Sequence, residues 1–75
     1  MKPGTAVRLT EHEQRILGLI AIGLGSKAIA QRIGGSPATV DNHRGRICAK
    51  LGADNAAHCV WRGIAEGYLQ PPEHV

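Results

Sequence analysis

The chain has 75 residues, a length that supports one small hydrophobic core and leaves little room for a second domain. Its net charge is +3, from nine basic and six acidic residues, and its two cysteines are typical of a compartment in which thiols stay reduced. Residues 1–10 lack the apolar segment of a signal peptide, and no apolar run reaches the roughly 18 residues of a membrane span, so we expect a soluble cytoplasmic protein. The sequence fits a whole gene product that begins at Met1, and equally one domain of a longer protein.

Four helices are predicted, because apolar residues recur at helical spacing and no alternating strand pattern is present. The first opens with Thr10 as N-cap and Glu13 three residues later, which is the signature of a capping box, and Gly23 ends it. The second helix is short, with Ser26 as its predicted N-cap and a stop at Gly34.

The third helix is predicted from about Pro37 to Leu51, between Ser36 as N-cap and Gly52 as a left-handed C-cap. The fourth begins near residue 54 or 55, and its apolar side chains are Val60, Trp61, Ile64, Ala65 and Tyr68. These elements divide the chain into a flexible N-terminal arm (1–8), one all-α domain of four helices (9–69) and a flexible C-terminal tail (70–75).

Basic residues are concentrated in the central unit formed by residues 26–51. This unit has a net charge of +4, from Lys27, Arg32, Arg44, Arg46 and Lys50 against Asp41 alone. A short helix, a glycine turn and a longer capped helix form the plan of a helix-turn-helix, and its basic surplus suits a surface that faces phosphates. A solvated basic face without a partner is the alternative on charge alone.

A helical wheel separates an inner from an outer face of the third helix. Val40, Ile47 and Leu51 cluster on the side that we expect to face the core. The opposite side consists mainly of small residues, which are Ala38, Asn42, Gly45 and Ala49, with Arg46 beside them. Asn42 is the best candidate base reader, because a carboxamide can pair with adenine through two hydrogen bonds, while Arg46 could reach guanine or a phosphate.

The stretch from Leu9 to about Leu69 resembles the C-terminal DNA-binding domain of LuxR-type (GerE-like) transcription regulators. The resemblance is carried by Leu9, Thr10, Glu13, Gly23, Lys27, Ile29, Ala30, Arg32, Ser36, Thr39, Val40, His43, Ile47, Lys50, Leu51, Gly52 and Asn55. It implies a four-helix domain whose third helix enters the major groove and whose fourth helix often forms a dimer interface.

The residues expected to contact DNA are Lys27, Ser36, Thr39, Asp41, Asn42, His43, Gly45, Arg46 and Lys50. Lys27, Thr39 and Lys50 suit phosphates, together with the amides at the start of the helix that Ser36 caps. His43 matches the family's histidine, and we leave open whether it is structural or contacts DNA.

Two of these residues depart from the family pattern. Asp41 and Gly45 stand where similar proteins often place base-contacting residues, frequently lysine or arginine. An acidic side chain repels phosphate, although it can accept a hydrogen bond from cytosine N4, and Gly45 offers no side chain. Gly35 also replaces a residue that is usually aliphatic.

Two predictions concern contacts made by the first and fourth helices. Glu13 falls on the apolar face of its helix, so we expect it to bond the Thr10 backbone and to pair with a cation, with Arg44 as the candidate. The apolar residues of the fourth helix span two faces, which predicts a homodimer interface at Val60, Trp61 and Ile64, with Trp61 packing inward.

The predicted function is a non-enzymatic DNA-binding transcription regulator, or the DNA-binding part of one, that acts as a homodimer on a two-fold related site. The alternative is a helix-turn-helix module that binds RNA polymerase or another regulator, and Asp41 and Gly45 favour it. No metal-ligand spacing, phosphate loop or nucleophile motif is present, so neither a cofactor nor enzymatic activity is expected. The expected location is cytoplasmic and nucleoid-associated.

Overall fold

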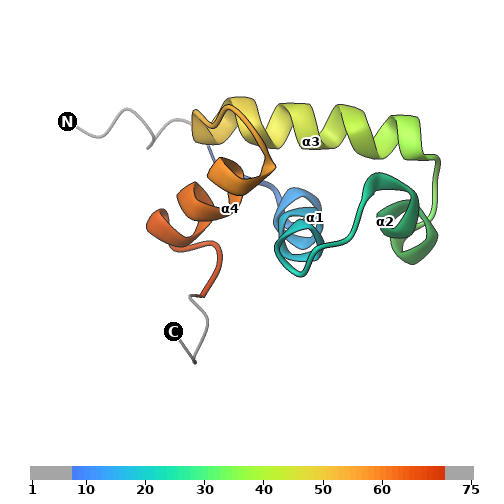
Figure 1. Cartoon of the computed structure of the whole chain (residues 1–75), viewed down its shortest axis with the longest axis horizontal. Helices are drawn as coiled ribbons and strands as arrows, with labels where there is room; N and C mark the ends of the chain where they lie inside the picture. The colour runs from blue at the N-terminus through green and yellow to red at the C-terminus, as the bar shows by residue number, and fades with distance from the viewer. Residues whose placement is uncertain (1–7, 71–75) are drawn as a thin grey trace.

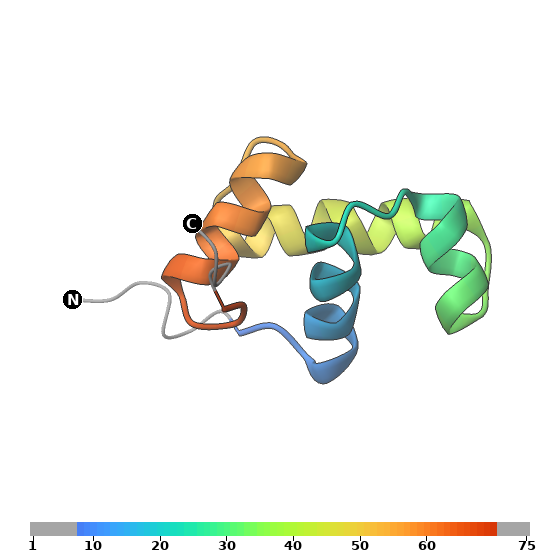
Figure 2. The same cartoon turned by 60° about the horizontal axis from the view of Figure 1, so that its bottom comes forward.

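A computed structural model of the protein describes residues 8–70, in which four helices and no strand are found. The helices are α1 (Glu11–Ala21), α2 (Ser26–Ile33), α3 (Pro37–Leu51) and α4 (Ala56–Ala65). α3 is the longest, and the other three lie along one side of it, with α2 near its N-terminal end and α4 near its C-terminal end (Figures 1 and 2). The prediction of an all-α, four-helix domain is confirmed, whereas the predicted arm and tail fall mostly on residues 1–7 and 71–75, outside the described residues.

Local sequence explains where three of the four helices begin. Thr10 Oγ1 accepts a hydrogen bond from the Glu13 amide at 3.1 Å, and Glu13 Oε1 accepts one from the Thr10 amide at 2.9 Å. Ser36 caps α3 and Asn55 caps α4 through their side-chain oxygens. These bonds satisfy amides that the first turn of a helix leaves without a backbone partner, and they confirm the predicted starts.

The start of α2 corrects a prediction, because its N-cap is Gly25 and Ser26 is the first helical residue. The Ser26 hydroxyl is engaged by α3 instead, where it donates a hydrogen bond to the Asp41 carboxylate. A hydrogen bond to a charged group is stronger than one between two neutral groups, such as a cap hydroxyl and a backbone amide. The cap preference of serine, which considers only neighbours in sequence, therefore misplaced this side chain.

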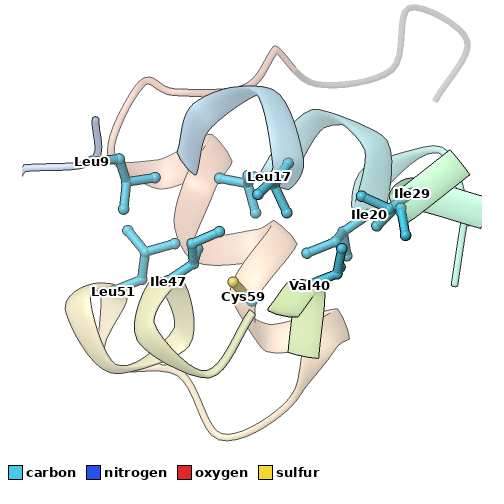
Figure 3. Close-up of a cluster of buried hydrophobic side chains, with 10 residues drawn as sticks. Leu9, Leu17, Ile20, Ile29, Val40, Ile47, Leu51 and Cys59 are labelled. Carbon is cyan, nitrogen blue, oxygen red and sulfur yellow. The ribbon is translucent and has the colours of Figure 1, made fainter. Parts of the chain in front are cut away.

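The core lies where α1, α2 and α4 meet the inner side of α3 (Figure 3). Its buried apolar residues are Leu9, Ile16, Leu17, Ile20, Ile29, Ala30, Val40, Ile47, Leu51 and Cys59. Burial of one large aliphatic side chain contributes about 1.5–3 kcal/mol, so the three core residues of α3 are enough to fix which face of this helix points outward. The predicted inward positions of Val40, Ile47 and Leu51 are confirmed.

α4 approaches α1 closely at Gly63, which the sequence did not single out. A Cβ atom on Gly63 would lie 2.8 Å from Leu17 Cδ2 and 3.1 Å from Leu69 Cδ1. Such distances are too short for carbon atoms in contact, which pack at about 3.5–4.0 Å. The inner face of α4 therefore depends on the lack of a side chain at Gly63.

The prediction that Trp61 packs inward was wrong, because this residue is 62% exposed. Small residues, Cys59 and Gly63, form the buried side of α4 instead. The close approach of α4 to α1 leaves no room for an indole on that side. A helical wheel does not show this distance, so it predicted that the large apolar side chain would be buried.

Candidate nucleic-acid interface

The turn between α2 and α3 is built on glycine, as predicted. Gly34 follows α2 with a φ of 83°, a left-handed value that residues with a side chain rarely adopt, and its amide donates to the Ala30 carbonyl at 2.8 Å. Ile29 and Ala30 are buried against the core, while Val40 anchors the start of α3 there. This unit presents the N-terminal half of α3 at one end of the molecule (Figure 1).

One long side of α3 is not covered by the other helices (Figures 1 and 2). The exposed residues along α3 are Pro37, Ala38, Thr39, Asp41, Asn42, Gly45, Arg46 and Ala49. A Cβ atom on Gly45 would meet nothing within 4 Å, so no contact inside the domain requires glycine there. Because several of these side chains are small, they extend only a short way from the helix axis. Asn42 and Arg46 are the candidates on this surface for hydrogen bonds to base edges.

Exposed polar and basic groups flank the N-terminal half of α3. Lys27 and Arg32 are both exposed on α2, and only Lys27 was a predicted contact residue. Ser36 Oγ accepts from the Thr39 amide at 3.2 Å and lies 3.1 Å from Thr39 Oγ1. Both hydroxyls thus lie at the N-terminus of α3, where the helix dipole favours a negative ligand.

Lys50 is held by an ion pair with α1. Its Nζ donates to Glu13 Oε1 at 2.7 Å and to the Arg8 carbonyl at 3.3 Å, and the side chains of Lys50 and Glu13 are 27% and 5% exposed. The predicted burial of Glu13 is confirmed, but its cation is Lys50, not the predicted Arg44. Arg44 lies closer to the N-terminus of α3, where Ser26 accepts a hydrogen bond from it.

The environment of Glu13 favours its charged form. Burial raises the pKa of the carboxyl, but the hydrogen bond from Lys50, the bonds from Thr10 and the Lys50 charge outweigh burial and hold this pKa below its ordinary value. At neutral pH the ion pair therefore connects the C-terminal half of α3 to α1.

His43 lies beside the outer face rather than on it. It is half-buried, and its ring packs edge-on against the ring of His12, with centroids 5.1 Å apart and an interplanar angle of 75°. Its Nδ1 atom is buried and finds no hydrogen-bond partner among the described residues. The contact between the two rings joins α1 to α3.

Asp41 and Arg44 both reach back from α3 to the start of α2. The Ser26 hydroxyl donates to Asp41 Oδ1 and accepts from Arg44 Nη1, the latter at 3.2 Å. Sequence reasoning missed this cluster, since the three side chains meet only when the two helices pack. The charge of Asp41 could have indicated the cluster, because Asp41 is the only acidic residue between Ser26 and Leu51 and so the only carboxylate there for a basic or hydroxyl partner.

The residues predicted to form a dimer interface lie on α4. Val60 and Ile64 are half-buried, and Trp61 is one of two large apolar residues that the described part of the chain exposes strongly, the other being Ile22 at 65%. The exposed indole is thus available on the side of α4 that does not pack on the core.

The two cysteines are free, with Cys48 half-buried on α3 and Cys59 buried on α4. Burial, together with contact with the Cys48 thiol, raises the pKa of Cys59 to about 12. This thiol stays protonated at neutral pH, which makes it a packing group rather than a nucleophile. Within residues 8–70, no group of three or more metal-ligating side chains gathers, and no helix could span a membrane.

Comparison with known proteins places this geometry in a family of regulators. Residues 7–62 match the bacterial regulatory proteins of the luxR family. The transcriptional regulatory protein FixJ of Rhizobium meliloti is 37% identical over 60 residues, which are 80% of this chain and 29% of FixJ. The methanol utilization control regulatory protein MoxX of Paracoccus denitrificans is 45% identical over 64 residues, which are 84% of this chain and 29% of MoxX.

A solved structure shares the fold. The crystal structure of the phage VqmA-DPO complex superimposes with a TM-score of 0.76 at 29% identity, over 95% of this chain and 34% of that one. The chain therefore spans less than a third of the length of the regulators that it matches, and about a third of this structure.

Proposed function

Because this chain belongs to the luxR family of bacterial regulatory proteins, and is a DNA-binding transcription regulator or the DNA-binding part of one, we propose that its α3 enters the major groove of double-stranded DNA. The uncovered side of α3 is the observation that carries this proposal. The major groove of B-DNA, about 12 Å wide, admits an α-helix, and a surface of small residues lets the helix axis lie deep in it. In that position Asn42 and Arg46 would hydrogen-bond to base edges.

We assign the phosphate contacts to groups around the start of α3. Lys27, Ser36 and Thr39 are exposed there, and the first amides of α3 add partial positive charge. Lys50 contributes less, because Glu13 neutralises its charge at 2.7 Å. Asp41, His43 and Gly45, on or beside the same face, complete the proposed interface.

We further propose a homodimer through α4 on a two-fold related DNA site. Trp61 is strongly exposed on α4, and the half-buried Val60 and Ile64 lie beside it in the helix. A symmetric interface would set two copies of α3 about one DNA turn apart, roughly 34 Å. Such a regulator would act in the cytoplasm, associated with the nucleoid, and would need no catalytic group.

The experiment combines selection of a binding site from random DNA with affinity measured against salt. Affinity should fall with a log–log slope of about −0.9 for each phosphate contacted. Lys27→Ala should weaken binding to all sequences and make the slope shallower by about one contact. Asn42→Ala should instead reduce affinity for the selected site by about 1–3 kcal/mol and change binding to random DNA little.

Arg15→Ala is the matched control for Lys27→Ala. Arg15 is exposed on α1, so its removal changes the net charge equally but leaves the uncovered side of α3 untouched. An equal loss of affinity for both variants would mean that net charge alone attracts DNA. Absence of binding to any DNA at low salt would favour the second candidate, a protein-interaction module that contacts RNA polymerase or another regulator, for which the acidic Asp41 on this face is the supporting observation.

A further inference from the structure

The Ser26 hydroxyl connects the two helices of the helix-turn-helix at the edge of the proposed DNA-facing surface. It donates to Asp41 Oδ1 and accepts from Arg44 Nη1 at 3.2 Å. Ser26 and Arg44 are half-buried, whereas Asp41 is exposed. Two groups of opposite charge, both on α3, thus hold one side chain at the start of α2.

The Asp41 carboxylate bonds the first residue of a helix that has no side-chain cap. Gly25 has no side chain to accept from the first amides of α2, and the first turn of α2 contains no acidic residue. A helix N-terminus carries partial positive charge, which a nearby carboxylate stabilises. The orientation of Asp41 toward α2 is therefore favoured by a hydrogen bond and by the helix dipole together.

We infer that Asp41 is a positioning residue, which with Ser26 and Arg44 fixes α3 relative to the start of α2, and that it does not read a base. Ser26 directly precedes Lys27, and Asp41 directly precedes Asn42. A bond between Ser26 and Asp41 therefore fixes the separation between a proposed phosphate contact and the proposed base reader. This inference rests on the proposed DNA-binding function. It adds an explanation of how the proposed phosphate contact and the proposed base reader are held at a fixed separation.

The test uses the full chain, one DNA site selected from random sequence and one unrelated duplex. Ser26→Ala removes the bridging hydroxyl but keeps every charge of the surface. We expect its affinity for the selected site to fall roughly tenfold and its affinity for the unrelated duplex to stay within about twofold, because a coupled contact is lost while the phosphate contacts remain. Ser26→Thr, which keeps a hydroxyl, is the matched control and should retain the ratio of the two affinities.

Three other outcomes would overturn the inference. If Asp41 reads a base, Ser26→Ala keeps the affinity ratio, and Asp41→Asn changes the preferred base at one position of the selected site. If Asp41 only repels phosphates, Asp41→Asn raises affinity for both duplexes alike and Ser26→Ala changes neither. If the wild type binds no DNA at low salt, the proposed function fails together with the inference, whereas binding that Ser26→Ala leaves unchanged rejects the inference alone.

Thermal unfolding of each variant verifies that it is folded at the temperature of the binding assay. If Ser26→Ala unfolds below that temperature, Ser26→Cys takes its place, since a thiol fills similar space but hydrogen-bonds weakly. The same tenfold change in the affinity ratio is expected of it. A loss of stability alone would not change that ratio among folded molecules.

Discussion

Gly45 and Gly63 both lie inside helices, but a methyl group added at these two positions should change thermal stability in opposite directions. A Cβ atom on Gly45 would meet nothing within 4 Å, whereas one on Gly63 would lie 2.8 Å from Leu17 Cδ2. Glycine in a helix is less favourable than alanine by about 1 kcal/mol, which Gly45→Ala should recover. We expect a rise in Tm of roughly 4–8 °C for a domain of this size, measured by thermal unfolding.

Gly63→Ala is the paired prediction and should lower Tm, because overpacking a close contact costs about 1–3 kcal/mol and exceeds the gain in helix propensity. Gly18→Ala, at another helical glycine with open space around it, provides a second control with the sign of Gly45→Ala. A rise in Tm for Gly63→Ala would show that Leu17 and Leu69 can move aside.

The Glu13–Lys50 ion pair gives stability a defined dependence on pH. The pKa of Glu13 is lowered in the folded protein relative to an unfolded value of about 4.3. The contribution of the Glu13 carboxylate to the free energy of unfolding is therefore complete above about pH 4.3. It is lost as the pH falls through the lowered pKa of Glu13 in the folded protein. Glu13→Gln should remove this acid-range part of the stability curve, measured by urea unfolding between pH 7 and pH 3.

Removal of the cation should reverse that dependence. In Lys50→Met the carboxylate stays buried without its partner, which costs about 3–5 kcal/mol, and burial then raises the pKa of Glu13. With a raised folded pKa, stability is greater at low pH and is lost as the pH rises, so acidification should partly rescue this variant. If the unfolding midpoint of Lys50→Met followed pH as the wild type does, Glu13 would have another cation.

At the scale of single elements, the N-terminus of α3 combines capping with the proposed phosphate contact. Aspartate caps helices about as well as serine does, so Ser36→Asp should leave Tm nearly unchanged while adding a negative charge where DNA phosphates are proposed to lie. We expect affinity for DNA to fall severalfold, more at low salt than at high salt, in a fluorescence anisotropy titration.

Asn55→Asp is the control for that element. Asn55 caps α4 through its side chain, as Ser36 caps α3, and the substitution changes the net charge by the same amount at a helix outside the proposed interface. Equal losses for Ser36→Asp and Asn55→Asp would show that the start of α3 does not face the phosphates.

For the whole molecule, the exposed side of α4 predicts association. A chain of this length buries only about 60% of its unfolded surface, so covering an exposed indole adds stability that one small core lacks. Trp61→Gln should weaken a dimer without unfolding the monomer, because Trp61 is 62% exposed. Sedimentation over a range of concentrations measures this, and a small interface of this kind should dissociate at micromolar concentration.

Ile22→Gln serves as the comparison for the dimer. Ile22 is 65% exposed at the end of α1, so this variant removes a similarly exposed apolar side chain away from α4. Equal effects of the two variants would indicate nonspecific association, and a wild type that stays monomeric on DNA at high micromolar concentration would reject the dimer.

The sequence by itself determined the order of the helices, the caps at Thr10 and Ser36, the start of α4 to within about a residue, and the inner face of α3. Each of these follows from residues within about four positions of one another, because capping bonds and helical faces repeat on that scale. The burial of Glu13 was predictable for the same reason. The sequence also located the uncovered side of α3, since a helix that buries Val40 and Ile47 must expose the opposite residues.

Only the tertiary structure decided which partners those residues take. Glu13 pairs with Lys50, not Arg44, and Ser26 bonds Asp41 across two helices instead of capping its own. Trp61 lies outside because Gly63 brings α4 too close to α1 for a large side chain. Contacts between helices depend on crossing geometry and on the volumes of both partners, and a periodic pattern along one helix contains neither quantity.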